Sequence, residues 1–245
     1  MNVVKRGRII HIIVRLIIIL TMVGCVFLGI WGSAEYPDGS NYFMSAFTCL
    51  IMLIITFVPS YLNNRTRMIV PAALETAFVI FTFLAMYVGD LLNYYEKYWW
   101  WDSMLHSSSG FMLGLVGYLL FYSMNRNKDS IFEMSNACII LFAFCFAMTC
   151  GVLWEFFEFG MDYLTGSNMQ KSIYVTDIQE MSRYINSWGR MMDPGLVDTM
   201  KDLIVDAIGA AAAVLGGYLF IRHHNGNKRK IASILEEAEN NSIEG

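Results

Sequence analysis

The sequence carries little charge. Only 16% of its 245 residues are Asp, Glu, Lys or Arg, whereas ordinary globular domains have about 25%. Hydrophobic residues make up 56% of the chain, and the mean hydropathy is +0.46. The net charge of −4 is mild and argues against nucleic acid as a partner. These features exclude an ordinary soluble protein and predict an integral membrane protein that lies in a lipid bilayer.

Several familiar motifs are also absent. The chain has no internal repeat, no glycine-rich phosphate loop, no nucleophile elbow and no C-x-x-C pair. Its five cysteines all lie in apolar segments, which predicts buried, inert thiols rather than disulfides or metal ligands. They are Cys25, Cys49, Cys138, Cys145 and Cys150.

What the chain has instead is long apolar runs. Six are close to the 20 or so residues that cross the hydrocarbon as a helix. The first lacks a small-residue cleavage site and is expected to be a retained helix rather than a signal peptide. We therefore predict an all-α, polytopic helical bundle, with a membrane domain over 1–224 and a polar cytoplasmic tail over 225–245. The predicted spans are 9–31, 42–62, 69–92, 103–124, 136–159 and 200–222.

The distribution of Lys and Arg predicts the orientation. Basic residues gather at the N-terminus, in the second and fourth connections and in the tail, whereas the first connection has none. By the positive-inside rule, both termini lie in the cytoplasm. The long fifth connection carries apolar residues at helical spacing over 176–188, which predicts an amphipathic helix on the outer surface.

The sixth apolar run begins with an acidic ladder. Asp198, Asp202 and Asp206 recur every four residues, so a helix would stack them along one face over about 12 Å. A small-residue tract, GAAAAVLGG, follows and favours close helix packing. Carboxylates at membrane depth are costly, and they are functional-site hypotheses for that reason.

Two further motifs lie at the same predicted depth. Asp102 and His106 open the fourth span at i and i+4, and Glu155 and Glu158 end the fifth at i and i+3. With the ladder, three helices bring six acids and one imidazole to the outer side of the membrane. The serines that follow His106 are poor nucleophile candidates, since adjacent helical side chains point about 100° apart.

So many acids cannot all be charged and unpaired in a low-dielectric site. A divalent metal cation could neutralise them, because oxygen ligands suit Mg, Ca or Mn and one imidazole also suits Zn or Fe. Alternatively, some acids stay protonated and form a proton relay. A third interpretation places several of them in water at the membrane edge, and for Asp198 the position also suits a helix N-cap.

The motifs W-W-D-S-M-L-H-S-S-S-G, W-E-F-F-E and D-T-M-K-D-L-I-V-D-A-I-G-A resemble the YjdF-type family of bacterial inner-membrane proteins. More distantly they are similar to the VanZ-like group, on whose pattern Asp102, His106, Glu155, Asp202 and Gly209 match. Asp206 stands where that pattern favours Asn. The resemblance covers the last three spans and implies the bacterial cytoplasmic (inner) membrane. VanZ-like members are associated with tolerance to glycopeptide antibiotics, which implies an envelope role.

The leading hypothesis is an outward-facing metal site formed by Asp102, His106, Glu155, Glu158, Asp198, Asp202 and Asp206. It would act on, or sense, an envelope lipid or lipid-linked substrate, and a metal-dependent membrane enzyme is one form of this hypothesis. One alternative is a proton- or cation-coupled transporter, although Glu75 alone supplies an acid in the cytoplasmic half. Another is a non-catalytic membrane scaffold.

Overall fold

The computed structural model describes residues 3–31, 42–65, 71–125, 134–171, 185 and 191–243. Within these ranges the regular elements are helices, apart from one isolated bridge between Ile185 and Met191. The predicted amphipathic helix over 176–188 lies outside the described residues, Ile185 excepted. Six helices are long and apolar enough to cross a membrane, which confirms the predicted all-α, six-span architecture. They cover Gly7–Trp31, Tyr42–Tyr61, Ala72–Leu91, Trp101–Asn125, Asn136–Thr165 and Pro194–His224.

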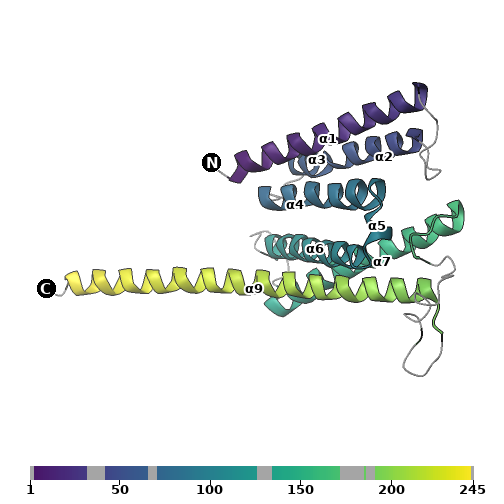
Figure 1. The fold of residues 1–245 in the computed structure, drawn as a ribbon. Helices are drawn as coiled ribbons and strands as arrows, with labels where there is room; N and C mark the ends of the chain where they lie inside the picture. Colours follow the sequence, from purple (N-terminus) through teal and green to yellow (C-terminus); the bar gives the residue numbers. More distant parts are fainter. Residues whose placement is uncertain are drawn as a thin grey trace. The chain divides into compact units, whose positions relative to one another are not determined.

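The chain divides into two compact units, residues 1–112 and 113–245. Figure 1 labels the helices of both units and follows the sequence from purple to yellow. The first unit contains six elements and the start of a seventh, α6 (Trp101–Asn125). The six are α1 (Val3–Trp31), α2 (Tyr42–Ile55), α3 (Val58–Arg65), α4 (Ala72–Thr82), η1 (Phe83–Leu91) and α5 (Tyr94–Lys97).

The core of the first unit consists of ordinary apolar side chains. Helix α1 packs against α2 and α4. Val14 and Ile18, one turn apart on α1, meet Cys49 and Met52 of α2 and Val79 of α4. All five are buried, so Cys49 is an apolar packing residue, as the sequence predicts. The predicted burial is wrong for Cys138 and Cys145, which are exposed.

The second span is broken near its end. Proline has no N–H, so Pro59 cannot donate to the carbonyl of Ile55, and α2 ends there. The turn at Thr56–Phe57 leads into α3, where Pro59 is tolerated in the first turn. Arg15 of α1 caps the break, donating from Nη2 to the Thr56 carbonyl at 2.9 Å and from Nε to Thr56 Oγ1 at 3.2 Å. A cation at a helix C-terminus also interacts favourably with the helix dipole.

The third span changes its helical winding. α4 passes at Thr82 into a nine-residue π-helix, η1, which ends at Leu91. Asn93, just before α5, lies in the left-handed region with φ of 61°. Long π-helices are rare, and short ones occur often at functional sites. Here Gly89 admits the ring of Tyr95, because a Cβ at residue 89 would lie 2.5 Å from Tyr95 Cε2. The hydropathy pattern predicts the span but contains nothing that distinguishes π from α winding.

The second unit contains the later part of α6, α7 (Asn136–Thr165) and α9 (Pro194–Ile243). Small residues let these helices approach closely. A Cβ at Gly114 of α6 would lie 2.9 Å from the Ala210 carbonyl of α9. A Cβ at Gly117 would lie 3.0 Å from the Ala143 carbonyl of α7. This unit is therefore held by backbone-to-backbone contacts.

α7 and α9 are both longer than the predicted spans. α7 continues to Thr165 and ends at Gly166 in the left-handed conformation typical of a helix C-cap. α9 begins six residues before the predicted start, at Pro194, and its backbone stays helical to Ile243. The tail sequence ILEEAEN is rich in good helix formers, which explains the extension.

Candidate functional site

The end of α7 has an inverted pattern of exposure. Glu155 and Glu158 are only 4% and 7% exposed, whereas Phe156 between them is 67% exposed. A soluble helix would bury the ring and expose the acids. This pattern is expected of a membrane helix that has lipid against one face and the polar interior of the protein against the opposite face. Trp154 supports this arrangement, because its Nε1 donates to Glu158 Oε1 at 2.8 Å.

The acidic ladder of α9 is buried along its whole length. Asp198, Asp202 and Asp206 are 7%, 1% and 3% exposed. None of them is the helix N-cap. That role belongs to Asp193, whose Oδ1 accepts from the N–H of Leu196 at 3.0 Å. The suggestion that Asp198 caps the helix is therefore wrong, because the helix begins earlier than the hydropathy pattern indicates.

The ends of α7 and α9 that carry the acids lie together within the second unit. A Cβ at Gly151 would lie 2.8 Å from Asp206 Oδ2, so these two positions are in contact. Further along, Ala143 and Val214 share one core cluster. Residue numbers rise on α7 as they fall on α9, so the two helices are antiparallel.

This register pairs the acids. Moving one turn from Gly151 and Asp206 toward the connecting loop reaches Glu155 on α7 and Asp202 on α9. One further turn reaches Glu158 and Asp198. The prediction that the fifth and sixth spans carry their acids at one depth is consistent with this register. A side chain at 151 would have to displace the Asp206 carboxylate.

The start of α6 holds the remaining two predicted residues. Asp102 and His106 are 9% and 6% exposed, and Asp102 Oδ1 lies 3.7 Å from His106 Nε2, one turn along the same helix. The neighbouring serine hydroxyls bond to the backbone of their own helix, Ser108 to Met104 and Ser109 to His106. Those bonds support the view that the serines are not nucleophiles.

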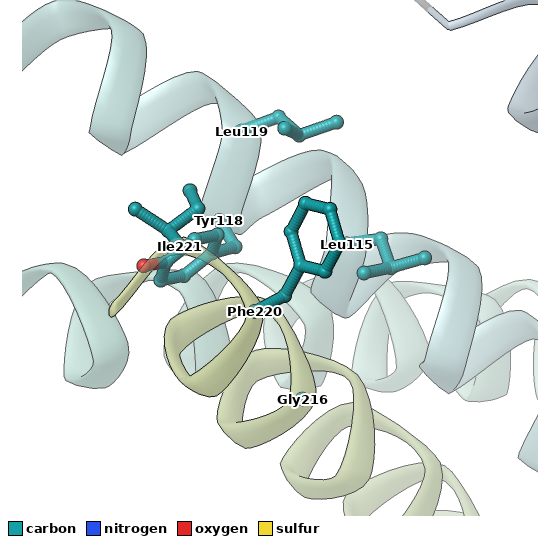
Figure 2. A pocket seen from close by; sticks show the side chains of 7 residues that line it. Leu115, Tyr118, Leu119, Gly216, Phe220 and Ile221 are labelled. Carbon is teal, nitrogen blue, oxygen red and sulfur yellow. The ribbon is translucent and has the colours of Figure 1, made fainter. Parts of the chain in front are cut away.

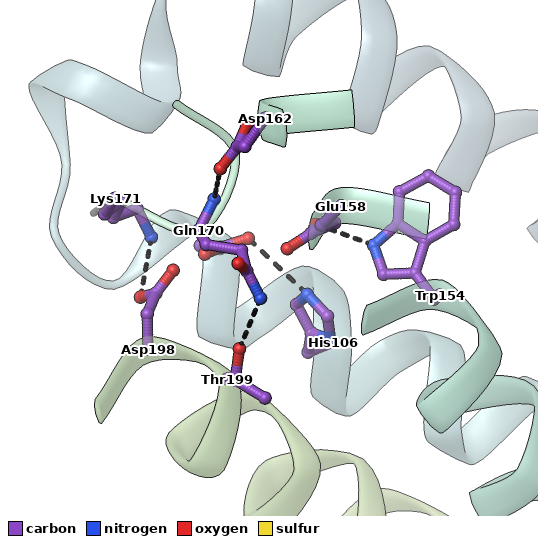
Figure 3. Close-up of polar contacts among 9 residues, drawn as sticks. His106, Trp154, Glu158, Asp162, Gln170, Lys171, Asp198 and Thr199 are labelled. Carbon is purple, nitrogen blue, oxygen red and sulfur yellow. Dashed lines mark hydrogen bonds and ion pairs between the residues drawn. The ribbon is translucent and has the colours of Figure 1, made fainter. Parts of the chain in front are cut away.

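Two residues of the loop after α7 contact the first turns of α9. Lys171 Nζ lies 3.2 Å from Asp198 Oδ1, and Gln170 Nε2 donates to Thr199 Oγ1 at 2.9 Å (Figure 3). The sequence analysis did not single out Lys171, since a lone lysine in a polar connection carries no pattern. It also missed Asp193 as the cap, although Asp-Pro-Gly before an apolar run is a helix-start signal.

An apolar hollow of about 280 Å³ lies elsewhere in the second unit, between the later part of α6 and α9 (Figure 2). Gly217 makes room for the Tyr118 ring, which a Cβ would meet at 3.0 Å. Leu115, Leu119, Phe220 and Ile221 complete its wall. It contains no charged group and is separate from the acids, so it is not the candidate site.

In the second unit, five carboxylates of one sign are thus buried at one end of the α7–α9 pair, and Lys171 reaches Asp198 among them. Burying like charges costs free energy unless cations or shared protons compensate. The fold and this site define a helical membrane protein with six apolar spans and buried acids at the ends of spans.

The chain belongs to the family described as Predicted membrane protein (DUF2238), whose model matches residues 13–223. It is also similar to an uncharacterized protein of Thermotoga maritima, with 30% identity over 154 residues. That match covers 62% of this chain and 66% of the relative, so the chain spans just under two thirds of that protein's length. No solved structure matches the chain.

Proposed function

We propose that the protein binds a divalent metal cation through the buried acids and acts on, or senses, an envelope lipid or lipid-linked substrate. The observation that carries the proposal is the register of α7 and α9. Gly151 and Asp206 are in contact, and Glu155 and Asp202 lie one helical turn further along α7 and α9, toward the connecting loop. Both carboxylates are at most 4% exposed. Paired carboxylates are the ligands that hard divalent cations prefer.

Asp102 and His106 are included for their chemistry and their own surroundings. Both are buried at the start of α6, where Asp102 Oδ1 lies 3.7 Å from His106 Nε2, one turn along the same helix. An imidazole beside a carboxylate suits several divalent cations.

The ligand set that we propose at minimum is Asp102, His106 and Asp202, all three buried. Glu155 is the next proposed ligand, because it lies at the same depth as Asp202. Glu158, Asp198 and Asp206 would balance charge or complete the coordination. One imidazole with several carboxylates suits Mn, Fe or Zn as well as Mg. Such a cation could polarise a phosphoryl or carbonyl oxygen, or lower the pKa of a bound water.

The envelope assignment rests on two sequence features. The Lys and Arg distribution predicts that the acidic ends of the spans face outward. The resemblance to YjdF-type and VanZ-like proteins of the bacterial inner membrane points to the same compartment. A site at the outer face of the inner membrane would be within reach of lipid head groups.

The test is elemental analysis of detergent-purified protein. We expect about one metal per chain in the wild type and a loss in Glu155→Gln/Asp202→Asn. The matched control is Glu96→Gln/Asp193→Asn, which also removes two acids. Both of its positions are exposed, and Asn caps a helix about as well as Asp. Equal metal content in the first variant and the wild type would refute the site.

A second candidate function is a proton- or cation-coupled transporter, because the first unit contains polar groups inside its spans. The second span is broken at Thr56, Arg15 donates to that break, and Ser60 donates to Glu75 of α4. Broken helices are common in transporters. Proteoliposome flux that requires both Glu75 and Asp202 would favour this function. Normal flux in Glu75→Gln, or no flux in the wild type, would count against it.

A further inference from the structure

The loop after α7 has an unusual backbone. The chain leaves the helix through Gly166, with φ of 71°, and reaches Lys171, which itself has φ of 49°. Glycine adopts such angles freely, but a lysine in this region is strained. Contacts from the surroundings must therefore hold Lys171 in place.

Asp162, in the last turn of α7, holds this loop. Its Oδ1 accepts from Ser167 Oγ at 2.8 Å and from the N–H of Met169 at 2.7 Å. Its Oδ2 accepts from the N–H of Gln170 at 2.9 Å. Three donors on one carboxylate fix the loop up to the residue before Lys171. These contacts give Asp162 a structural role in the loop.

These three hydrogen bonds to Asp162, which we call the clasp, place two side chains. Gln170 reaches Thr199, and Lys171 reaches Asp198, both in the first turns of α9 (Figure 3). The lysine side chain is 30% exposed, while the Asp198 side chain is 8% exposed. The loop thus brings one positive charge from the solvent side to the outermost acid of the ladder.

We infer that Asp162 is a positioning residue that presents Lys171 as a tethered counter-cation of the acidic site, where it competes with a divalent cation for Asp198. The competition rests on the proposed metal site, whereas the pairing of Lys171 with Asp198 stands on the contacts alone. A fixed ammonium lowers the cost of burying Asp198 when no metal is bound. It also repels an incoming cation, so metal binding has to displace it.

The first experiment needs no metal. Lysine acylation in detergent-purified protein, followed by mass spectrometry, reports how freely each amine reacts. We expect Lys171 to react about threefold faster in Asp198→Asn and in Asp162→Asn than in the wild type. Asparagine at 162 places an NH₂ where Oδ2 accepts from Gln170, so it opens the clasp. Lys97, which donates to the Leu92 carbonyl, is the internal reference, and Glu96→Gln is the control variant.

Unchanged Lys171 reactivity in both variants would overturn the clasp. A rise in Asp198→Asn alone would also do so, because Asp162 would then not be acting through Lys171.

The second experiment is Mn²⁺ titration of the full chain, followed by electron paramagnetic resonance. We expect Lys171→Met to bind Mn²⁺ about tenfold more tightly than the wild type, which corresponds to about 1.4 kcal/mol. Asp162→Asn should change the affinity in the same direction, and Asp162→Asn/Lys171→Met should bind no more tightly than Lys171→Met alone. Lys97→Met is the control and should bind as the wild type does.

The outcomes separate the two proposals. Weaker or unchanged binding in Lys171→Met, with normal binding in the wild type, would overturn the competition and leave the metal site intact. No Mn²⁺ binding in the wild type would overturn the metal site and the competition together. The acylation result decides the pairing of Lys171 with Asp198 in either case.

Discussion

The two units bury polar groups in different ways. In the first unit Arg15 and Ser60, two polar residues inside the spans, have complementary partners. Arg15 donates to the carbonyl that the break in α2 leaves open, and its guanidinium lies 3.8 Å from the centre of the Phe57 ring. In the second unit five buried acids share one sign, and Lys171 reaches one of them, Asp198.

The difference shows which polar groups serve the fold and which do not. A donor beside an open carbonyl stabilises a broken helix and needs no further ligand. Five acids of one sign do not stabilise a helix pair by themselves, and they persist only where something else compensates for them. The apolar packing of the two units differs as well. Large side chains such as Ile18 and Met52 fill the core of the first unit, whereas Gly114 and Ala210 let two helix backbones approach closely in the second.

The largest expected effect is that of metal on the helix ends that carry the acids. Mn²⁺ at about 100 times its dissociation constant should stabilise the folded protein by about 2.7 kcal/mol. Hydrogen exchange should slow over 194–210 in α9 and stay unchanged over 7–31 in α1. Asp202→Asn should abolish the slowing and, without metal, unfold at a higher temperature than the wild type, because one buried charge is gone. Equal slowing in both segments would contradict a site confined to the acids.

An added methyl group should affect stability differently at a small-residue contact and on an open helix surface. Gly114→Ala puts a methyl group 2.9 Å from a backbone carbonyl and should destabilise the protein by roughly 2 kcal/mol, measured by thermal unfolding in detergent. Gly216→Ala on α9 meets nothing within 4 Å and should be neutral or slightly stabilising, since alanine is the better helix former. If the two variants unfold at the same temperature, α6 and α9 are not in close contact.

In the first unit, removal of the cap should have a smaller cost. Arg15→Met keeps the length of the side chain but removes both donors to Thr56, and we expect a loss of about 1.5 kcal/mol in the free energy of unfolding. Arg15→Lys should recover part of this, because it keeps a charge and one donor. The same assay should show no change in Mn²⁺ affinity for either variant. A change would mean that the packing around Arg15 affects the metal site.

The smallest effect concerns the start of α9. Asp193→Ala should cost about 1 kcal/mol, because the N–H of Leu196 loses its acceptor, whereas Asp193→Asn should cost little. Circular dichroism during thermal unfolding measures both. A larger loss in Asp193→Asn than in Asp193→Ala would mean that the charge, rather than the cap, matters at this position.

Much of the architecture could be predicted from the sequence, because span recognition depends on local hydropathy. The predicted and observed second spans, for example, begin at the same residue, Tyr42. The break at Pro59 also follows from a local rule, although a hydropathy window passes over it. The π-winding of η1 and the early start of α9 at Pro194 are not visible in hydropathy, since both change backbone geometry without changing composition.

For the candidate site, the sequence by itself determined which residues carry charge and roughly how deep each lies along its own span, because spacing on a helix is local. Only the tertiary structure decided which faces of α7 and α9 meet. The contact between Gly151 and Asp206 joins helices separated by a long connection, and no local pattern specifies the rotation of one against the other. The same holds for Lys171, whose partner depends on a loop that Asp162 folds. Side chains distant in sequence acquire their environment only when the backbones pack.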